Sequence, residues 1–414
     1  MNILLIHQFY LEKDDPGGSR FNEMTKVWVK EGHQVTVIAG MVNYVTGKVP
    51  AKYHRKKYNL THYQESLSVL RCYVSPDYNA NFLGRLFAYF SFAWYGFWGI
   101  ILKLRSQKFD VIVATSPPLF VGGLAILVSW VKSVPYLFEV RDLWPESAIE
   151  TGVLKNRLII KISFWVESLI YRRAFAINVL TPAFKTKLID NKKVPSGKIL
   201  FIPNAADFSL SDSLLENPNS ASLREKLGWK NRFVVTYVGA HGVANHLIQI
   251  LNAASLADPS VLFVLIGDGM QKPDLKKIAM DRKLSNVQFI DSVPKQEVFQ
   301  FILASDVGLS VLKKIETFKT IYSNKTFDYM ACKKPILIAI DGVSRALMET
   351  AKCGLYAEPE NAEELVRQIN FLKANPTICN QMGENGYRFA KQHFDRNVLA
   401  KQYLDEIADR LKHV

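Results

Sequence analysis

The stretch FVVTYVGAHGVANHLIQIL, residues 233–251, decides the fold. Its first six residues are apolar, aromatic or β-branched and predict a buried strand, whereas the pattern from His246 onward predicts a helix. A short turn of mostly small residues, Gly239–Gly242, lies between them. A strand, a turn and a helix in succession form the unit from which parallel sheets covered by helices are built.

The same unit recurs along the chain in two groups. In the second half, further buried strands are predicted at Leu262–Ile266, Val287–Ile290, Asp306–Ser310 and Pro335–Ala339. In the first half they are predicted at Asn2–His7, Gln34–Ala39, Asp110–Ala114, Pro135–Val140 and Ala176–Leu180. Helix-like stretches lie between most of them. We therefore expect an α/β protein with two Rossmann-like domains that face each other across a cleft.

The domain boundaries follow from composition. The segment Phe208–Asn231 is rich in Ser, Asp and Asn and is interpreted as the linker. The expected domains are residues 1–206 and 207–386. The charged, amphipathic end of the chain, residues 387–414, is expected to form a helix that packs back on the first domain.

Composition and charge limit the class of protein. Of the 414 residues 49% are hydrophobic and 22% charged, which excludes disordered, collagen-like and coiled-coil chains. The four cysteines lie far apart, which disfavours a disulfide framework or a cysteine zinc site and favours a reducing compartment. Residues 1–200 carry +12 of the net charge of +14. A basic half favours an anionic partner: nucleic acid, a phosphorylated substrate or a membrane surface.

One segment, Leu86–Leu102, combines many aromatic residues with basic flanks. Its 17 residues carry no charge and lie between Arg85 and Lys103. A membrane span needs about 20 apolar residues, so an interfacial helix in the headgroup region and a buried core helix are favoured over a true span. The basic run at residues 52–57 is either a solvated loop or a contact for anionic lipid.

Three glycine-containing turns follow predicted strands and are candidates for phosphate binding. They are Pro16–Arg20, Gly239–Gly242 and Gly267–Gly269, the last with Lys272 three residues further on. Glycine lets a phosphate approach the backbone, and the N-terminus of the following helix favours negative charge. Plain loops, with Lys272 as a solvated residue at a helix start, are the alternative.

The segment Ser323–Ala331 predicts a helix with an acid near its start. Ser323 or Asn324 is a suitable N-cap, and the helix dipole favours Asp328 at that end. The same carboxylate can accept hydrogen bonds from two sugar hydroxyls. Both roles stay open.

The string FEVRDLWPES, residues 138–147, places charges and an indole at the end of a predicted strand. Folds of this kind bind ligands at the carboxyl edge of the sheet. Asp142 and Glu146 are candidates for positioning a hydroxyl group, and Trp144 can stack on a sugar ring. A cluster of structural ion pairs is the alternative.

Several common signatures are absent. The sequence has no DxD, no HExxH, no GxSxG and no Walker motif. Metal-dependent hydrolysis and ATP hydrolysis at a P-loop are therefore disfavoured. No RNA- or DNA-binding motif accompanies the basic charge, so nucleic acid is disfavoured as a partner.

Taken in order, these motifs resemble the retaining glycosyltransferases of family 4, the group 1 transferases, which have the GT-B architecture. The strings are GDGMQK at 267–272, NVQFIDSVPKQEV at 286–298, ASDVGLSVL at 304–312, NKTFDYMACKKPILIAIDG at 324–342, ENAEEL at 360–365 and MGENGYRF at 382–389. In the first half, VRDLWPES and the SPP at 116–118 resemble a subgroup that makes bacterial O-antigen and capsule and includes L-fucosamine transferases. The resemblance covers nearly the whole chain.

The resemblance implies an acceptor-binding first domain, a donor-binding second domain, and no metal or cofactor. It implies catalytic roles for Asp142, Glu146 and Lys272, with Lys272 on the diphosphate of the donor, and it places Asp328 on the ribose hydroxyls. The other donor-binding positions that it implies are Gly17, Gly18, Arg20, Gly239, His241, Gly269, Ile290, Thr320, Ser323 and Asn324. Thr320 stands where the family has the first acid of its E-x7-E motif.

The implied reaction moves a sugar, such as N-acetyl-L-fucosamine, from a UDP-sugar to a polyprenyl-diphosphate-linked saccharide. The implied location is the inner face of the cytoplasmic membrane, with residues 82–105 and nearby basic residues on the lipid. A GT-B nucleotide-sugar epimerase and a non-enzymatic membrane-associated scaffold are the alternatives.

Overall fold

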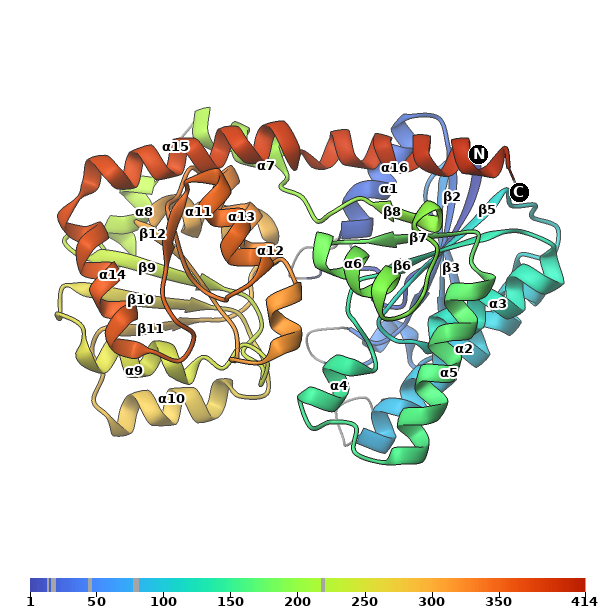
Figure 1. Ribbon diagram of the computed structural model, residues 1–414, viewed down its shortest axis with the longest axis horizontal. Helices are drawn as coiled ribbons and strands as arrows, with labels where there is room; N and C mark the ends of the chain where they lie inside the picture. The colour runs from blue at the N-terminus through green and yellow to red at the C-terminus, as the bar shows by residue number, and fades with distance from the viewer. Residues whose placement is uncertain (13–14, 16–19, 44–46, 77–81, 217–219, 414) are drawn as a thin grey trace. The chain divides into compact units, whose positions relative to one another are not determined.

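The computed structural model describes residues 1–12, 15, 20–43, 47–76, 82–216 and 220–413. The chain divides into two compact units (Figure 1). Unit 1 comprises Met1–Asp15, Ser19–Pro203 and Asn397–Val414, and unit 2 is formed by Asn204–Arg396. Each unit contains one sheet with helices on both faces.

Unit 1 is built around an eight-stranded sheet with the order β3-β4-β2-β1-β5-β6-β7-β8. Its strands are β1 (Asn2–Ile6), β2 (Gln34–Gly40), β3 (Tyr58–Gln64), β4 (Leu67–Cys72), β5 (Val111–Thr115), β6 (Tyr136–Val140), β7 (Ala176–Val179) and β8 (Ile199–Phe201). Neighbours are parallel except β3 and β4. The central strands are buried along their whole length, which is why they appear in the sequence as continuous apolar runs.

The helices of unit 1 cover this sheet. They are α1 (Arg20–Lys30), α2 (Phe82–Lys103), α3 (Phe120–Lys132), α4 (Glu146–Glu150), α5 (Arg157–Arg173), α6 (Pro182–Asp190) and α16 (Arg396–Leu411). Helix α16 comes from the end of the chain and packs on α1, where the Trp28 indole donates to the Ala400 carbonyl at 3.0 Å. Helices α2, α3 and α5 pack side by side.

Unit 2 is built around a six-stranded, fully parallel sheet with the order β11-β10-β9-β12-β13-β14. Its strands are β9 (Phe233–Val238), β10 (Val261–Ile266), β11 (Val287–Ile290), β12 (Val307–Val311), β13 (Ile336–Ala339) and β14 (Gly354–Tyr356). Its helices are α7 (Phe208–Glu216), α8 (Ser220–Lys226), α9 (Ile248–Leu256), α10 (Lys272–Asp281), α11 (Lys295–Ala304), α12 (Asn324–Ala331), α13 (Val343–Ala351), α14 (Ala362–Ala374) and α15 (Pro376–His393).

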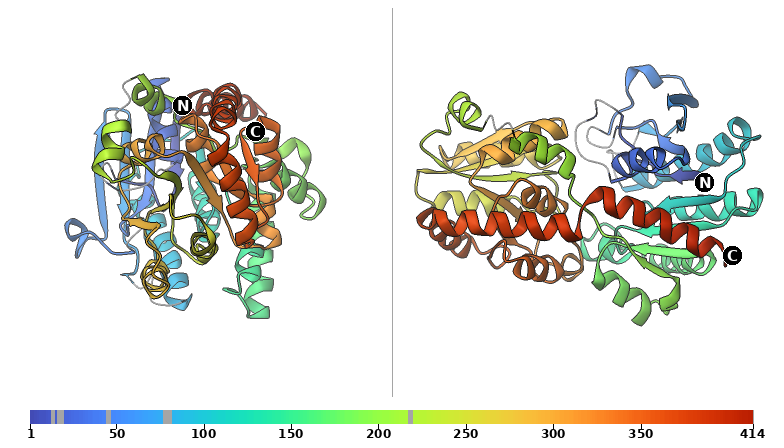
Figure 2. Two further views of the ribbon diagram at one scale, coloured as in Figure 1. Left: turned by 90° about the vertical axis from the view of Figure 1, so that its left-hand side faces the viewer. Right: turned by 90° about the horizontal axis from the view of Figure 1, so that it is seen from above.

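Alternate residues of each strand of unit 2 enter two separate cores. Val235, Phe263 and Leu309 face the core under α9, α10 and α14. Val234 and Ile338 face the opposite side, toward α8, α11, α12, α13 and α15. Successive side chains of a strand point to opposite faces, so a strand covered on both sides must be apolar throughout. Figure 2 shows both sheets from two further directions.

Several expectations from the sequence differ from the structure. The expected linker, Phe208–Asn231, forms α7 and α8 in its described part, because Phe208 and Trp229 are buried in the cores of unit 2. The chain instead passes between units at Pro203 and again at Arg396. The expected terminal helix is two helices, and Tyr387 lies within α15 of unit 2, so only α16 packs on unit 1.

Replacing Gly308 of β12 by alanine is expected to destabilise unit 2. A methyl group there would lie 2.3 Å from the ring of Tyr329. The ring cannot move away, because its hydroxyl donates to the carbonyls of Thr236 and Leu309 at 3.1 and 3.0 Å. Overpacking of this kind costs about 1–3 kcal/mol. Denaturant unfolding should detect the loss, whereas Gly123→Ala, whose methyl group meets no atom within 4 Å, should show none.

Candidate functional site

The strand order of unit 2 defines where a ligand should bind. The chain runs outward from β9 through β10 to β11 on one side, and returns to continue through β12, β13 and β14 on the other. The loops that follow β9 and β12 therefore diverge, and ligands of open parallel sheets bind at this switch point, beyond the carboxyl ends of the strands. We therefore expect ligand-binding residues just after β9 and β12.

The two predicted glycine turns of unit 2 lie against each other at this edge. The Gly239 amide donates to the Ile266 carbonyl at 2.9 Å, and the His241 amide donates to the Asp268 carbonyl at 2.8 Å. A Cβ on Gly267, whose φ is +141°, would lie 2.0 Å from the Gly239 carbonyl oxygen. Only glycine permits this approach, which brings both turns together beside the strand ends.

Lys325, which the sequence analysis did not select, lies on the other side of the switch point. It occupies the first turn of α12, and its Nζ lies 4.7 Å from the centre of the Tyr237 ring on β9. A Cβ on Gly239 would lie 3.2 Å from its Cε and 3.6 Å from its Nζ. Burial lowers the pKa of Lys325 to about 8, although the charge of Asp328 opposes the shift. Within the described part of the chain, the ammonium makes no hydrogen bond or ion pair.

Asp328 lies one turn further along α12, on the same helix face as Lys325. The helix is fixed to the sheet by the next residue, Tyr329, whose hydroxyl accepts from the Val238 amide at 3.1 Å as well as donating to two carbonyls. These bonds join α12 to β9 and β12. They hold Lys325 and Asp328 in a fixed position beside the Gly239 turn.

Lys272 begins α10 and is buried among oxygen atoms. Its Nζ donates to the carbonyls of Gly267 and Ile290 at 2.7 and 3.2 Å and to Asp291 Oδ1 at 2.6 Å, with Asp268 Oδ1 at 3.4 Å. The two carboxylates neutralise this ammonium, unlike that of Lys325. The Asp291 side chain is 79% exposed, so an incoming phosphate can replace it without disturbing a buried group.

His241 is fully buried next to the same turns. Neither ring nitrogen has a hydrogen-bond partner in the described part of the chain. Burial and the charge of Lys272 lower the pKa of His241 to about 4, and Asp268 opposes the shift. The imidazole is therefore neutral at pH 7, with one donor and one acceptor nitrogen available.

The shifted pKa of His241 predicts a pH dependence of stability. Between pH 6.5 and 4 the unfolded chain binds a proton at this residue and the folded chain does not, so the free energy of unfolding should fall as the pH falls. The contribution is on the order of 2 kcal/mol. Urea unfolding at pH 7 and pH 4.5 should show that the free energy of unfolding falls more for the wild type than for His241→Asn. Equal losses would mean that His241 does not titrate in this way.

The remaining donor-binding residues predicted in unit 2 are Thr320, Ser323, Asn324, Ile290 and Gly269. The Thr320 hydroxyl is buried and donates to the Thr317 carbonyl at 2.6 Å. Ser323 is the N-cap of α12, but its hydroxyl contacts Ser310 Oγ at 2.6 Å and makes no capping bond. Asn324 is exposed, and Ile290 contributes its carbonyl to Lys272. Gly269, with φ of +157°, packs against the His241 backbone.

The candidates near the start of the chain divide into two cases. Gly17 and Gly18 lie outside the described residues. Arg20 is buried in unit 1, where its Nε lies 3.2 Å from Glu139 Oε1 and its Nη2 donates to the Ile202 carbonyl at 2.7 Å. The Arg20 guanidinium also donates to the Pro203 carbonyl. The Arg20 guanidinium is therefore held inside unit 1 by one carboxylate and two carbonyls, and its donor-binding role stays a prediction.

Asp142 and Glu146 follow the end of β6, as predicted. Asp142 accepts from the Ser147 hydroxyl at 2.7 Å, and burial raises its pKa. Glu146 pairs with Lys192 at 2.5 Å, and Lys192 also pairs with the buried Glu167 at 2.6 Å. Glu146 therefore fits the structural ion-pair alternative, whereas Asp142 keeps a half-buried carboxyl group at the sheet edge.

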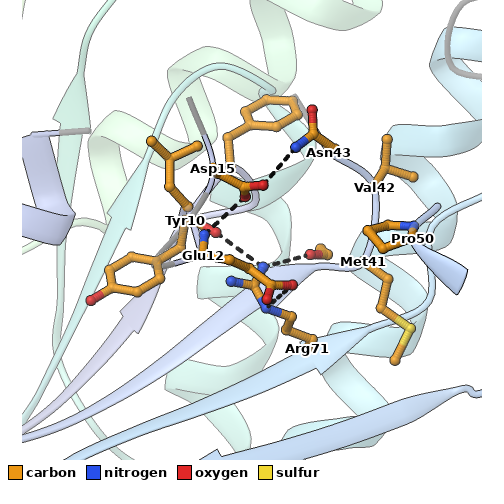
Figure 3. Close-up of a pocket in the computed structure, with 11 residues that line it drawn as sticks. Tyr10, Glu12, Asp15, Met41, Val42, Asn43, Pro50 and Arg71 are labelled. Atoms are coloured by element: carbon orange, nitrogen blue, oxygen red, sulfur yellow. Dashed lines mark hydrogen bonds and ion pairs between the residues drawn. The ribbon is translucent and has the colours of Figure 1, made fainter. Parts of the chain in front are cut away.

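A polar pocket of unit 1, which the sequence analysis missed, lies beyond the ends of β1 and β2 (Figure 3). Arg71 of β4 enters it and donates through Nη1 to the carbonyls of Tyr10 and Gly40 at 3.0 and 3.1 Å. Its Nη2 is buried without a partner in the described part of the chain. Glu12 lies 3.6 Å from the Arg71 Nε. Such a mixture of guanidinium and carboxylate suits the hydroxyl groups of a sugar.

Metal-ligating residues do not cluster in the described part of the chain. No three His, Cys, Asp or Glu side chains of those residues are grouped so that they can hold an ion. The four cysteines are buried and unpaired.

Comparison with known families identifies the chain. Residues 17–205 match the family described as glycosyl transferase 4-like domain, and residues 219–389 match the family described as glycosyl transferases group 1. The chain belongs to the group 1 glycosyltransferases. The family resemblance predicted from the sequence is confirmed.

Two relatives of this glycosyltransferase match most of its length. A protein of Escherichia coli K12 named as a colanic acid biosynthesis glycosyl transferase, WcaI, is 22% identical, and the match covers 94% of this chain and 95% of WcaI. The α-monoglucosyldiacylglycerol synthase of Acholeplasma laidlawii is 23% identical over 74% of this chain and 78% of its own.

Solved structures confirm the GT-B fold of the glycosyltransferase. Anabaena Alr3699/HepE, solved in complex with UDP-glucose, superposes with a TM-score of 0.72 at 17% identity, covering 99% of this chain and 100% of that chain. WaaG, described as a glycosyltransferase involved in lipopolysaccharide biosynthesis, gives 0.68 at 15% identity, covering 98% and 99%. At these identities the comparison shows the fold alone.

Proposed function

We propose that this glycosyltransferase moves a sugar from a UDP-sugar to a lipid-diphosphate-linked saccharide in the synthesis of a bacterial surface polysaccharide. The UDP-sugar would bind at the switch point of unit 2, and the acceptor would bind to unit 1. The anomeric carbon keeps its configuration, as in the retaining family that the sequence resembles.

The observation that carries this proposal is the position of Lys325. Its half-buried ammonium, which has no anionic hydrogen-bond partner among the residues that the structure describes, lies 4.7 Å from the Tyr237 ring centre, directly beside the Gly239 turn. Burying a cation without a counter-ion is unfavourable, so a diphosphate at this point would gain an ion pair and relieve that cost. Asp328 on the same helix face is then within reach of the adjoining ribose.

The residues present suit the departure of a nucleoside diphosphate. When the bond between the anomeric carbon and the β-phosphate oxygen breaks, negative charge develops on that oxygen, and positive charge develops on the sugar ring. Lys325, Lys272 and the amides of the glycine turns are placed to stabilise the negative charge. In a same-face displacement the leaving phosphate oxygen takes the proton of the acceptor hydroxyl as the new glycosidic bond forms. No divalent ion is needed in this scheme.

The sugar and the acceptor are proposed from similarity and charge. WcaI is named for colanic acid, and the VRDLWPES string resembles L-fucosamine transferases, so N-acetyl-L-fucosamine is the proposed sugar. The Acholeplasma relative is named for a glucosylated lipid. A lipid-linked acceptor also agrees with the basic first half of the chain, because its diphosphate is anionic and lies at the membrane surface.

Asp328→Asn is expected to weaken UDP binding by roughly 10–100-fold, since it replaces a charged acceptor of two ribose hydrogen bonds by a neutral one. Calorimetry should compare UDP with its 2′-deoxy and 3′-deoxy analogues. The affinity lost on substitution should be smaller for an analogue that lacks a ribose hydroxyl bound by Asp328. A loss of the same size for all three ligands would place Asp328 away from the ribose.

Mass spectrometry of products tests the reaction. The enzyme would be incubated with a panel of UDP-sugars and a synthetic lipid-diphosphate monosaccharide. The proposal predicts one product heavier by one sugar residue, and free UDP. Conversion of a UDP-sugar without an acceptor would indicate an epimerase or hydrolase, and an absence of both reaction and UDP binding would indicate a scaffold.

A further inference from the structure

Helices α2, α3 and α5 leave an unusual number of large apolar side chains in contact with solvent. The described residues contain 22 exposed large hydrophobic side chains, and eleven of them are on these three helices. They are Phe87, Phe90, Trp94, Trp98, Leu102, Leu127, Trp130, Val131, Leu158, Ile162 and Trp165. All four exposed tryptophans are in this group, which we name the three-helix face.

The three-helix face is continuous. Helix α3 packs against both α2 and α5, and the three lie side by side in unit 1 (Figure 1). On α2, the buried residues Ala88, Phe92 and Ile100 face the sheet, while Phe90, Trp94 and Trp98 recur about every four residues on the outer side. The helix thus has two apolar faces. One side of α2 belongs to the core of unit 1, and the other side is exposed to solvent.

Charge around the three-helix face is almost entirely positive. The three helices carry seven basic residues and one acid, Glu167. That acid is buried and paired with Lys192. The basic residues stand toward the helix ends: Arg85, Lys103, Lys132, Arg157, Lys161, Arg172 and Arg173. An apolar centre with tryptophans and a basic rim is the composition of surfaces that enter the headgroup region of anionic bilayers.

We infer that the three-helix face inserts into the headgroup layer of an anionic membrane, with the tryptophans of all three helices in the lipid interface. A second copy of the chain is the weaker occupant, because a symmetric interface would bring two basic rims together with no acid to pair with them. Among the helices of the described residues, none is long and apolar enough to cross a bilayer. The protein would therefore lie on the membrane surface through this face. The inference extends the proposed function, since it supplies the surface from which a lipid-linked acceptor would be reached.

Flotation with vesicles tests the inference without any sugar donor. The full chain is mixed with vesicles of phosphatidylglycerol and phosphatidylcholine in equal parts, or of phosphatidylcholine alone. The wild type should float with the anionic vesicles. The double variant Trp130→Glu/Trp165→Glu should bind at least about 30-fold more weakly, because two aromatic anchors are replaced by charges that repel the lipid. Trp130 and Trp165 are 80% and 63% exposed, so the substitutions fall on the surface.

Matched controls separate the possible outcomes. Met280→Glu, at a 71% exposed position of unit 2, should leave flotation unchanged. The urea unfolding curve should be the same in the double variant as in the wild type, which shows that the variant is folded. Unchanged flotation of the double variant would overturn the inference. A wild-type protein that is dimeric, with a double variant that is monomeric, would also overturn it. If vesicles bind but no sugar is transferred, the proposed function fails and the three-helix face stands.

Discussion

Replacing Lys325 by alanine is expected to lower the rate of sugar transfer by about 100–1,000-fold, the range seen when one preorganised donor to a developing anion is removed. The ammonium lies close to the Gly239 turn and, in the described part of the chain, has no anionic hydrogen-bond partner. UDP affinity should fall as well, because the ion pair forms in the ground state. Steady-state rates and UDP calorimetry measure the two effects.

The pH dependence of UDP binding distinguishes an electrostatic role from a structural one. Burial lowers the pKa of Lys325 to about 8, so the free enzyme loses this charge as the pH rises through 8. The wild-type affinity for UDP should therefore fall between pH 7 and pH 9.5, while that of Lys325→Ala stays flat over this step. Lys373→Ala, which removes an exposed ion pair with Asp258 on unit 2, is the matched control and should behave as the wild type. A Lys325→Ala enzyme with full activity would exclude the assigned role.

Replacing Lys272 by alanine is expected to reduce transfer by about 100-fold and to lower stability by about 1–3 kcal/mol. The stability loss arises because the carbonyls of Gly267 and Ile290 lose the ammonium that they share. The rate loss arises because a second positive charge disappears from beside the glycine turns. Thermal unfolding and transfer rates should be measured together, so that a folded but slow enzyme is recognised.

Asp291→Asn provides the complementary test of Lys272. Asp291 contacts the ammonium at 2.6 Å from an exposed position, and a phosphate would have to replace it. Removing the carboxylate charge should therefore strengthen UDP binding a few-fold, by roughly the worth of an exposed ion pair. Weaker binding by Asp291→Asn would indicate that the Lys272–Asp291 pair supports the loop rather than competing with the donor.

Most of the strands that could be predicted from the sequence are buried on both faces. The ten predicted strands all occur, because continuous apolar runs such as those of β1 and β10 have no other stable environment in a soluble domain. Strands β3 and β4 were missed. Strand β3 is polar and largely exposed at the sheet edge, so its sequence lacks an apolar run. Strands β8 and β14 have three residues each, too few for a pattern.

The candidate site was predicted only in part, because its geometry depends on contacts between distant residues. The glycine turns and Asp328 were predicted as site residues from local motifs. Lys325 was missed, since its significance comes from Gly239 and Tyr237, which precede it by more than eighty positions in the sequence. The burial of Arg20 could not be predicted for the same reason, because Glu139 and the Ile202 carbonyl bind it through contacts that no local pattern reveals. The aromatic content of α2 was visible, but the contribution of α3 and α5 to the same surface required the fold.

The central claim is that the lysines of unit 2, rather than a divalent ion, neutralise the diphosphate of the donor. Calorimetric titration of UDP in the presence of EDTA, repeated with manganese in place of the chelator, tests it most directly. We expect the same dissociation constant in both buffers for the wild type, and a marked loss of affinity in both for Lys325→Ala. UDP binding that requires manganese, or that survives unchanged in Lys325→Ala, would contradict it.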